Sequence, residues 1–79
     1  MIRIHLSKLL GERKWTQRYL ADITGIRPNT INQMYHEFID RINIEHIDKI
    51  CEALDCSVAD LIEYVPNSKK SENVKSRII

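Results

Sequence analysis

The sequence predicts an all-α fold organised as one small domain, and three observations lead to this prediction. Residues 16–36 indicate two helices joined by a tight turn at Gly25. Residues 44–54 place apolar side chains at helical spacing, which is typical of a helix with one buried face. The chain has 79 residues, a length that suits a single domain with a small core. We expect that domain to cover residues 1–66.

The N-terminal residues predict a short strand followed by a helix. Residues 1–6 alternate apolar with polar side chains, and a two-residue period is typical of a strand. Ser7 is expected to cap a first helix that runs to about Glu12. Leu9 and Leu10 are expected to face the interior of the domain.

A helix-turn-helix is predicted between residues 16 and 36. Thr16 is expected to cap its first helix, and Gly25 can adopt a positive φ cheaply where the chain reverses. Pro28 opens the second helix at a position where its missing N–H is no loss. The small side chain of Ala21 lets the two helices cross at close range, and Ile31 fills the angle between them.

The helix predicted over residues 28–36 has two contrasting faces. At about 100° per residue, the apolar face holds Ile31, Met34, Tyr35 and Phe38. The opposite, outward face holds Asn29, Asn32, Gln33 and His36. Asn and Gln can pair bidentately with an adenine edge in the major groove of DNA. A merely solvated face is the alternative, but such faces usually mix Lys with Glu in i,i+4 pairs, and this face has none.

The C-terminal part of the domain predicts two more helices and a second β-like segment. Asn43 is expected to cap a helix whose inward residues are Ile44, Ile47, Ile50, Cys51 and Leu54. Ser57 and Asp60 resemble a capping box that starts a short helix over 58–63. The segments IRIHL and IEYV are both β-like, and we expect them to pair. The alternative is that each one continues a neighbouring helix.

The net charge of +1 is unevenly distributed along the chain. Residues 1–36 hold six basic and two acidic side chains, and residues 37–65 hold two basic and eight acidic ones. Residues 66–79 hold four basic side chains and one acidic. We expect the basic N-terminal part to face phosphate and the acidic part to face away from it. A solvated face is again the alternative explanation for such charge blocks.

Several other functions find no support in the sequence. Two glycines cannot build a glycine-rich phosphate loop, and no serine or cysteine has a matching histidine and carboxylate, so we expect no enzyme and no cofactor. Cys51 and Cys56 have a poor zinc spacing and are expected to be buried, reduced thiols. No apolar run approaches membrane-spanning length, and the N-terminus lacks signal-peptide features, so a cytoplasmic protein is expected.

The run from Thr16 to Met34, followed by NIEHIDKICEALDCSVADLIEYVP, resembles the Cro/repressor-type (XRE) helix-turn-helix family, in particular its small stand-alone members. The dipeptides Thr-Gln and Leu-Ala, then Thr-Gly-Ile and an Ile-Cys-x-Ala-Leu ending, occur in the order typical of that family. The resemblance covers about residues 4–66. It implies a compact five-helix, lambda-repressor-like domain that binds specific DNA sequences in transcription control.

The resemblance also implies roles for individual residues. Gln17 matches a position that reaches a phosphate and sometimes a base, while Thr30 matches a backbone contact and the amides match base contacts. The candidate DNA-binding residues are Thr16, Gln17, Arg18, Arg27, Pro28, Asn29, Thr30, Asn32, Gln33 and His36.

Two positions depart from the family pattern. Arg27 replaces the usual Ser or Thr cap of the recognition helix. The usual glycine stop after that helix is missing at Tyr35-His36-Glu37-Phe38, so we expect another helical turn there.

The sequence therefore predicts a homodimeric repressor that reads double-stranded DNA with helix 28–36. The alternative is an antirepressor or antitoxin-like module that binds protein through the same fold. Residues 67–79 are expected to form a flexible basic tail. This tail either adds attraction for phosphate or docks on a neighbouring subunit through Val74, Ile78 and Ile79.

Overall fold

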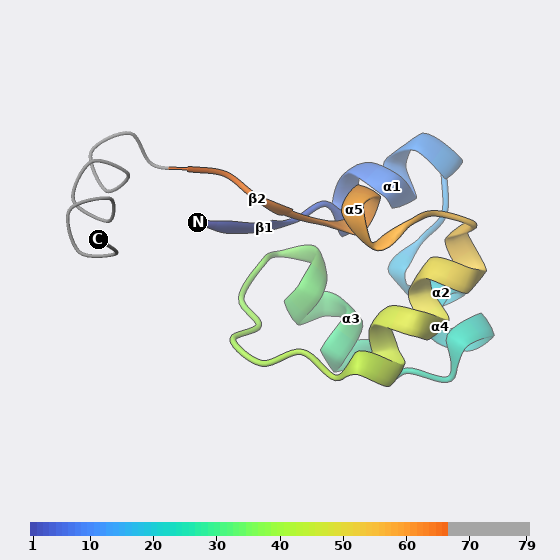
Figure 1. Cartoon of the computed structure of the whole chain (residues 1–79). Coiled ribbons are helices and arrows are strands. Elements are labelled where there is room, and N and C mark those ends of the chain that lie inside the picture. The colour runs from blue at the N-terminus through green and yellow to red at the C-terminus, as the bar shows by residue number, and fades with distance from the viewer. Residues whose placement is uncertain (67–79) are drawn as a thin grey trace, which may run out of the picture.

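The computed structural model of the protein describes residues 1–66, in which five helices lie beside a short two-stranded ribbon (Figure 1). The elements, in chain order, are β1 (Ile2–Ile4), α1 (Leu6–Arg13), α2 (Gln17–Thr24), α3 (Pro28–Tyr35), α4 (Ile44–Leu54), α5 (Val58–Leu61) and β2 (Ile62–Tyr64). The predicted mostly helical fold with five helices is confirmed. Within this described part of the chain, no helix is long and apolar enough to span a membrane. The tail predicted over 67–79 lies outside the described residues.

The two β-like segments do pair, which ties the ends of the domain together. β1 and β2 are antiparallel, with Ile2 opposite Tyr64 and Ile4 opposite Ile62. The ladder continues on both sides, because His5 N–H donates to the Leu61 carbonyl at 2.7 Å and Val65 N–H donates to that of Met1 at 2.8 Å. The expectation that the last helix runs to residue 63 is therefore wrong. α5 ends at Leu61 because the following residues pair with β1 instead.

The predicted cap of the first helix is also wrong. α1 begins at Leu6, with His5 rather than Ser7 at the N-cap position and no side-chain cap hydrogen bond. The helix starts early because His5 ends the ribbon and Leu6 is completely buried at the next position. Burial of one leucine side chain is worth about 1.5–3 kcal/mol, more than a typical cap of about 1 kcal/mol.

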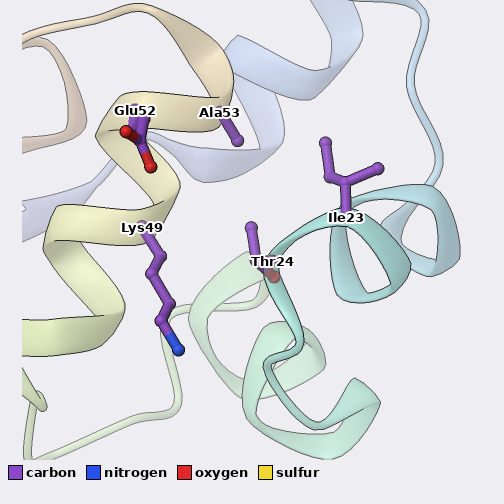
Figure 2. A pocket seen from close by; sticks show the side chains of 5 residues that line it. All are labelled: Ile23, Thr24, Lys49, Glu52 and Ala53. Carbon is purple, nitrogen blue, oxygen red and sulfur yellow. The ribbon is translucent and has the colours of Figure 1, made fainter.

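Helix α2 packs against both α3 and α4. Between α2 and α4 the packing leaves a shallow hollow, with Ile23 and Thr24 on one side and Lys49 and Ala53 on the other (Figure 2). Ile23 remains 46% exposed there. This hollow gives space for a larger side chain at Ala53.

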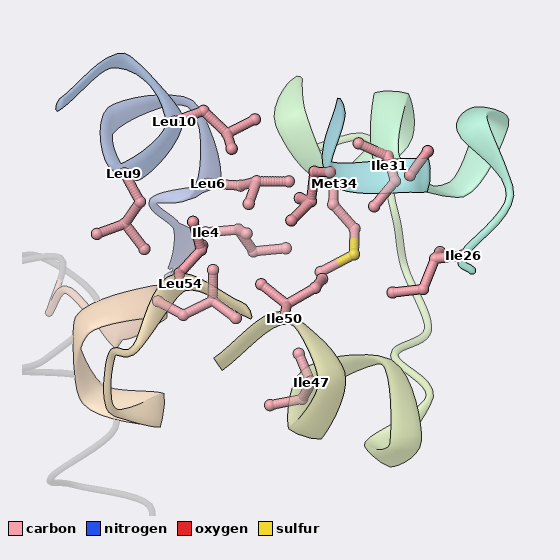
Figure 3. Packing of buried hydrophobic residues seen from close by; sticks show 13 residues of the cluster. Ile4, Leu6, Leu9, Leu10, Ile26, Ile31, Met34, Ile47, Ile50 and Leu54 are labelled. Carbon is pink, nitrogen blue, oxygen red and sulfur yellow. The ribbon is translucent and has the colours of Figure 1, made fainter. Parts of the chain in front are cut away.

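The core lies where β1 and the five helices converge (Figure 3). Leu9 and Leu10 are buried as predicted, and Met34 of α3 faces Ile50 of α4. The buried apolar set is Ile4, Leu6, Leu9, Leu10, Leu20, Ala21, Ile26, Ile31, Met34, Ile47, Ile50, Leu54 and Leu61. Each long element thus contributes one apolar stripe to a single core.

Helix α4 follows its prediction except at its first residue. The Asn43 side chain accepts a hydrogen bond from Glu45 N–H at 2.8 Å, so the predicted cap is confirmed. Ile47, Ile50 and Leu54 are buried, but Ile44 is 81% exposed and its predicted burial is wrong. Ile44 is the first helical residue, and its Cβ points back toward the N-terminus of α4, past the edge of the core.

The two cysteines are free thiols, as predicted, but they are only half-buried. Asp55 adopts a left-handed conformation after α4 and turns the chain so that the Cys56 and Cys51 thiols meet. Burial raises the pKa of Cys56 to about 11, and the Cys51 thiol contributes to this rise. A thiol with such a pKa remains protonated at neutral pH and is a poor nucleophile.

The end of α3 differs from the expected extra turn. Glu37 takes φ = 59°, and the N–H groups of Glu37 and Phe38 donate to the carbonyls of Met34 and Gln33 at 3.2 and 2.8 Å. These two bonds make a Schellman motif that closes α3 without a glycine. Phe38 therefore leaves the helix and is 77% exposed, so its predicted place on the buried face is wrong.

The side chain of Glu37 offsets the cost of its unusual backbone. Arg3 donates to both carboxylate oxygens, from Nε at 2.8 Å and from Nη2 at 2.9 Å, and Ile4 N–H donates to Oε1 at 3.0 Å. The hydrogen bonds from Arg3 and then from Ile4 lower the pKa of Glu37 to about 2. The carboxylate thus links the end of α3 to the outer edge of β1.

We expect Glu37→Gln to lower the melting temperature at neutral pH. The pKa of Glu37 is about 2 in the folded state against an ordinary value of 4.5, so its stabilisation is complete above 4.5 and is lost as the pH falls toward 2. The difference between wild type and variant should shrink over that range. Thermal unfolding followed by circular dichroism at several pH values measures it.

Glu12→Gln is the matched control for this prediction. Its carboxylate lies 3.9 Å from Arg13 and is 54% exposed, so its loss should change the melting temperature little at any pH. A Glu37→Gln protein as stable as wild type at neutral pH would show that the carboxylate does not hold this junction.

Candidate nucleic-acid interface

The turn between α2 and α3 has the geometry that the sequence predicts. Thr16 accepts a hydrogen bond from Tyr19 N–H at 3.0 Å and caps α2. Gly25 has φ = 73°, and its N–H donates to the Ala21 carbonyl at 2.9 Å. Pro28 is the first residue of α3. The cap therefore fixes where α2 begins, and the glycine and the proline form the turn into α3.

The Thr24 hydroxyl stabilises this turn, a role that the sequence interpretation missed. It donates to the Leu20 carbonyl at 2.6 Å and accepts from Ile26 N–H at 3.3 Å. Ile26, only 3% exposed, is thereby held in the core. The signal was a threonine directly before the glycine, because Ser and Thr side chains bond to nearby backbone groups at helix ends.

Helix α3 is held by one face and presents the other to solvent. Ile31 is completely buried, whereas Asn29, Asn32 and Gln33 are exposed. At its N-terminus, Arg27 makes no side-chain cap hydrogen bond, as expected from the missing Ser or Thr. The first N–H groups of α3 are therefore not occupied by a cap, and such a helix end attracts anions.

The starts of α2 and α3 come together around a shallow hollow. Its lining residues are Gln17, Arg18, Asp22, Pro28, Asn29 and Asn32. Asn32 Nδ2 donates to Gln17 Oε1 at 3.2 Å, which fixes one amide from each helix relative to the other. Five predicted site residues are thus neighbours. Asp22 is an acidic side chain beside them that the sequence interpretation did not include.

A second hollow lies on the other side of α3. It brings two predicted residues, Thr30 and Gln33, next to the loop after α3 and the start of α4. The added side chains there are Ile39, Asp40, Arg41, Ile42, Asn43 and His46. Arg41 and His46 were not predicted as site residues. Arg41 could have been found as the one arginine or lysine between Glu37 and Asp48.

The remaining predicted residues lie apart from these hollows. His36 follows the last residue of α3, where its ring stacks on Phe38 with the ring centres 5.7 Å apart. Thr16 uses its hydroxyl to cap α2, and Arg27 precedes α3. His36 therefore lies at the opposite end of α3 from Asn29.

In the folded chain, fewer of the basic side chains of residues 1–36 are available to meet phosphate than the sequence predicts. Arg3 is bound to Glu37, and Arg13 donates to the carbonyls of Leu54 at 2.6 Å and Leu9 at 3.2 Å. These two arginines thus hold the fold together. The side chains left to meet phosphate in residues 1–36 are Lys8, Lys14, Arg18 and Arg27.

Among residues 1–66 no three His, Cys, Asp or Glu side chains are grouped so that they could hold a metal ion. The polar groups on α3 are instead neutral amides, which donate and accept hydrogen bonds. Such a surface is suited to recognising other hydrogen-bonding edges.

Comparisons with known proteins agree with this geometry. Residues 5–67 match the family model of the Cro/C1-type HTH DNA-binding domain. A crystal structure of a "putative DNA-binding protein" from Bacteroides fragilis is similar, with a TM-score of 0.70 and 25% identity over 80% of this chain and 100% of that one. A search of curated proteins gives no match. Because the family model covers most of its length, the chain belongs to the Cro/C1-type helix-turn-helix DNA-binding family.

Proposed function

We propose that the protein is a sequence-specific transcriptional regulator, a repressor, that reads the major groove of double-stranded DNA with α3. The observation that carries this proposal is the exposed row of Asn29, Asn32 and Gln33 on a helix whose opposite face is locked into the core. Neutral amides in a row cost little to leave in water and gain specific partners on a base edge.

The proposed contacts divide into two kinds. Asn29 and Gln33 would pair with base edges, for which adenine offers a matching donor and acceptor. Gln17, Arg18 and Arg27 would meet phosphates beside the uncapped N-terminus of α3, together with Thr30. The hydrogen bond from Asn32 to Gln17 prepares one amide pair before DNA arrives, which reduces the ordering cost of binding.

The proposed repressor acts as a homodimer. One helix of eight residues spans only a few base pairs and cannot define an operator. Two copies on half-sites about 10–10.5 base pairs apart would double the protein–DNA interface and supply the specificity. A dimer that occupies its operator is sufficient for repression, and the cytoplasmic location expected from the sequence fits this role.

A protein-binding module is the second candidate, favoured by the acidic character of residues 37–65. Asp22 in the hollow beside Asn29 also opposes phosphate. Heparin chromatography at low salt separates the two candidates. The proposed DNA reader should be retained and should elute steeply with salt, whereas an antirepressor or antitoxin-like module should flow through.

Selection of bound sequences from a random duplex pool at physiological salt tests the proposed function directly. We expect enrichment of a palindrome whose half-sites are one helical turn apart. Enrichment of a single half-site would remove the dimer from the proposal. If no sequence is enriched from the pool and the protein also flows through the heparin column, the proposed DNA binding is contradicted.

We propose that residues 67–79 add phosphate attraction through Lys69, Lys70, Lys75 and Arg77. Truncation after Asn67 should leave the melting temperature nearly unchanged. It should reduce the slope of log affinity against log salt by about 0.9 for each phosphate that the tail neutralises in the full chain. Titration of labelled duplex at several salt concentrations measures this slope. An unchanged slope would mean that these cations do not bind DNA.

A further inference from the structure

The β1–β2 ribbon projects beyond the helices (Figure 1). Five exposed apolar side chains lie on this ribbon or in the loop beside it. Ile2 lies opposite Tyr64 on one face of the ribbon. The next pair out, Met1 and Val65, is joined by two hydrogen bonds, and its side chains lie on the other face. Ile42 joins this group from the loop after α3, because it lines one hollow together with Ile2. These five residues, between 36% and 71% exposed, are called the ribbon patch below.

The hollow that Ile2 and Ile42 share has apolar walls and charges of both signs nearby. Its lining residues are Ile2, Ile4, Glu37, Ile39, Asp40 and Ile42. Arg3 is bound to Glu37 there, and the exposed Arg41, which lines the adjoining hollow beside Thr30, follows Asp40 directly in the chain. This end of the molecule therefore combines a projecting ridge, an apolar hollow, and matched acidic and basic groups.

We propose that the ribbon patch and its hollow form a two-fold interface with a second copy of the chain. In such an interface each subunit uses the same surface. That surface must therefore carry both the ridge and the hollow that receives the partner's ridge, and both the acidic and the basic groups that pair across the interface. The ribbon of one subunit would enter the hollow of the other, with Asp40 of each subunit near Arg41 of its partner. The inference depends on the proposed function, because an operator with two half-sites requires a dimer.

The exposed area agrees with this assignment. A large apolar side chain presents on the order of 200 Å² in full, so five at roughly half exposure, counted over both faces of the projecting ribbon and the loop beside it, present about 500 Å². A standard interface buries about 800 Å² per partner, of which about 60% is apolar, or about 500 Å². Apolar patches near this size on soluble proteins mark interaction sites.

The neighbouring charges disfavour nucleic acid as the occupant of this surface. Glu37 and Asp40 line the hollow, and Glu63 on the ribbon is paired with His5 at 2.6 Å. These acidic groups are balanced by Arg3, Arg41 and the N-terminal ammonium, so the surface lacks the basic excess that draws phosphates. A second copy, by contrast, brings one Arg41 for each Asp40.

Sedimentation equilibrium of Tyr64→Glu and Ile42→Glu tests the proposed interface. The wild-type chain should be a dimer at micromolar concentration, and each variant should raise the dimer dissociation constant at least about tenfold, because it buries an unpaired carboxylate in the interface. Ile23→Glu is the matched control. It changes an apolar residue of 46% exposure on α2, outside the ribbon patch, and should remain dimeric.

Thermal unfolding establishes that each variant is folded. Tyr64→Glu changes the ribbon itself and can disrupt it, whereas Ile42→Glu lies in the loop after α3 and still tests the interface in that case. A monomeric wild type, or a folded variant that dimerises like wild type, overturns the inference. Loss of the dimer on truncation after Asn67 also overturns it, because the tail would then hold the subunits together.

The same variants separate this inference from the proposed function. Monomeric Tyr64→Glu should bind a single half-site as wild type does, because α3 is unchanged, and should lose the gain from a second half-site. If the wild-type protein is a dimer but binds neither a single half-site nor a paired one, the proposed DNA binding is contradicted and the proposed interface is not.

Discussion

Ala21→Leu is expected to destabilise the domain severely, because it forces three additional heavy atoms into the contact that orients α3. Ala21 is 5% exposed on the buried face of α2, which packs against both α3 and α4. Overpacking of this kind costs about 1–3 kcal/mol. Each kcal/mol corresponds to a fall of roughly 4–8 °C in the melting temperature of a domain of this size.

Ala53→Leu is the matched control for that experiment. It makes the same substitution on α4, where Ala53 faces the open hollow in Figure 2 and is only half-buried. We expect it to change the melting temperature by far less than Ala21→Leu. Calorimetry of both variants measures the difference. If Ala21→Leu unfolds at the wild-type temperature and binds DNA normally, the helices do not cross at this residue.

Asn29→Ala and Gln33→Ala should each weaken binding to the selected operator by about 1–3 kcal/mol, or roughly 5- to 150-fold. Each should also relax the base preference at one position, since an alanine cannot distinguish the base edges. Fluorescence anisotropy with operator variants measures both effects. The melting temperatures should stay near wild type, because both side chains are exposed.

The control for these two variants is Glu52→Gln on α4. Glu52 lies on the hollow between α2 and α4, away from the amide face of α3, so the operator affinity should be unchanged. Full specificity in both alanine variants would exclude the proposed role of α3. A matching loss of affinity for random DNA would instead indicate phosphate contacts.

The sequence predicts most of the fold because its strongest signals are local. Thr16, Asn43 and the Ser57–Asp60 box form the caps that their spacing predicts. Gly25 takes the positive φ expected of it. Each of these features depends on a few neighbouring residues, which a linear sequence displays directly.

The failed predictions depend on residues that are far apart in the chain. The end of α3 at Glu37 could not be foreseen from the missing glycine, because Arg3 supplies the compensating hydrogen bonds from 34 positions away. The start of α1 and the end of α5 are likewise set by pairing between the two termini. Ile44 shows a different limit, since helical periodicity does not say where the core ends.

The sequence predicts the candidate site as a set of residues but not as an arrangement. Asn29, Asn32 and Gln33 do share an exposed face. The hydrogen bond from Asn32 to Gln17 and the position of Arg41 beside Thr30 depend on how separate elements pack. Helical periodicity indicates which face of α3 is polar, but only the folded structure shows which residues of other elements lie beside that face.

The ribbon of β1 and β2 determines when this protein can finish folding. Its strands are separated by nearly the whole domain, and closing a loop of about 60 residues costs about 3–4 kcal/mol of chain entropy. During synthesis β1 leaves the ribosome first and has no strand partner until β2 has followed. The helices can assemble earlier, but β1 joins the ribbon only after β2 has been made, so nascent chains should remain open to proteases at β1 until then.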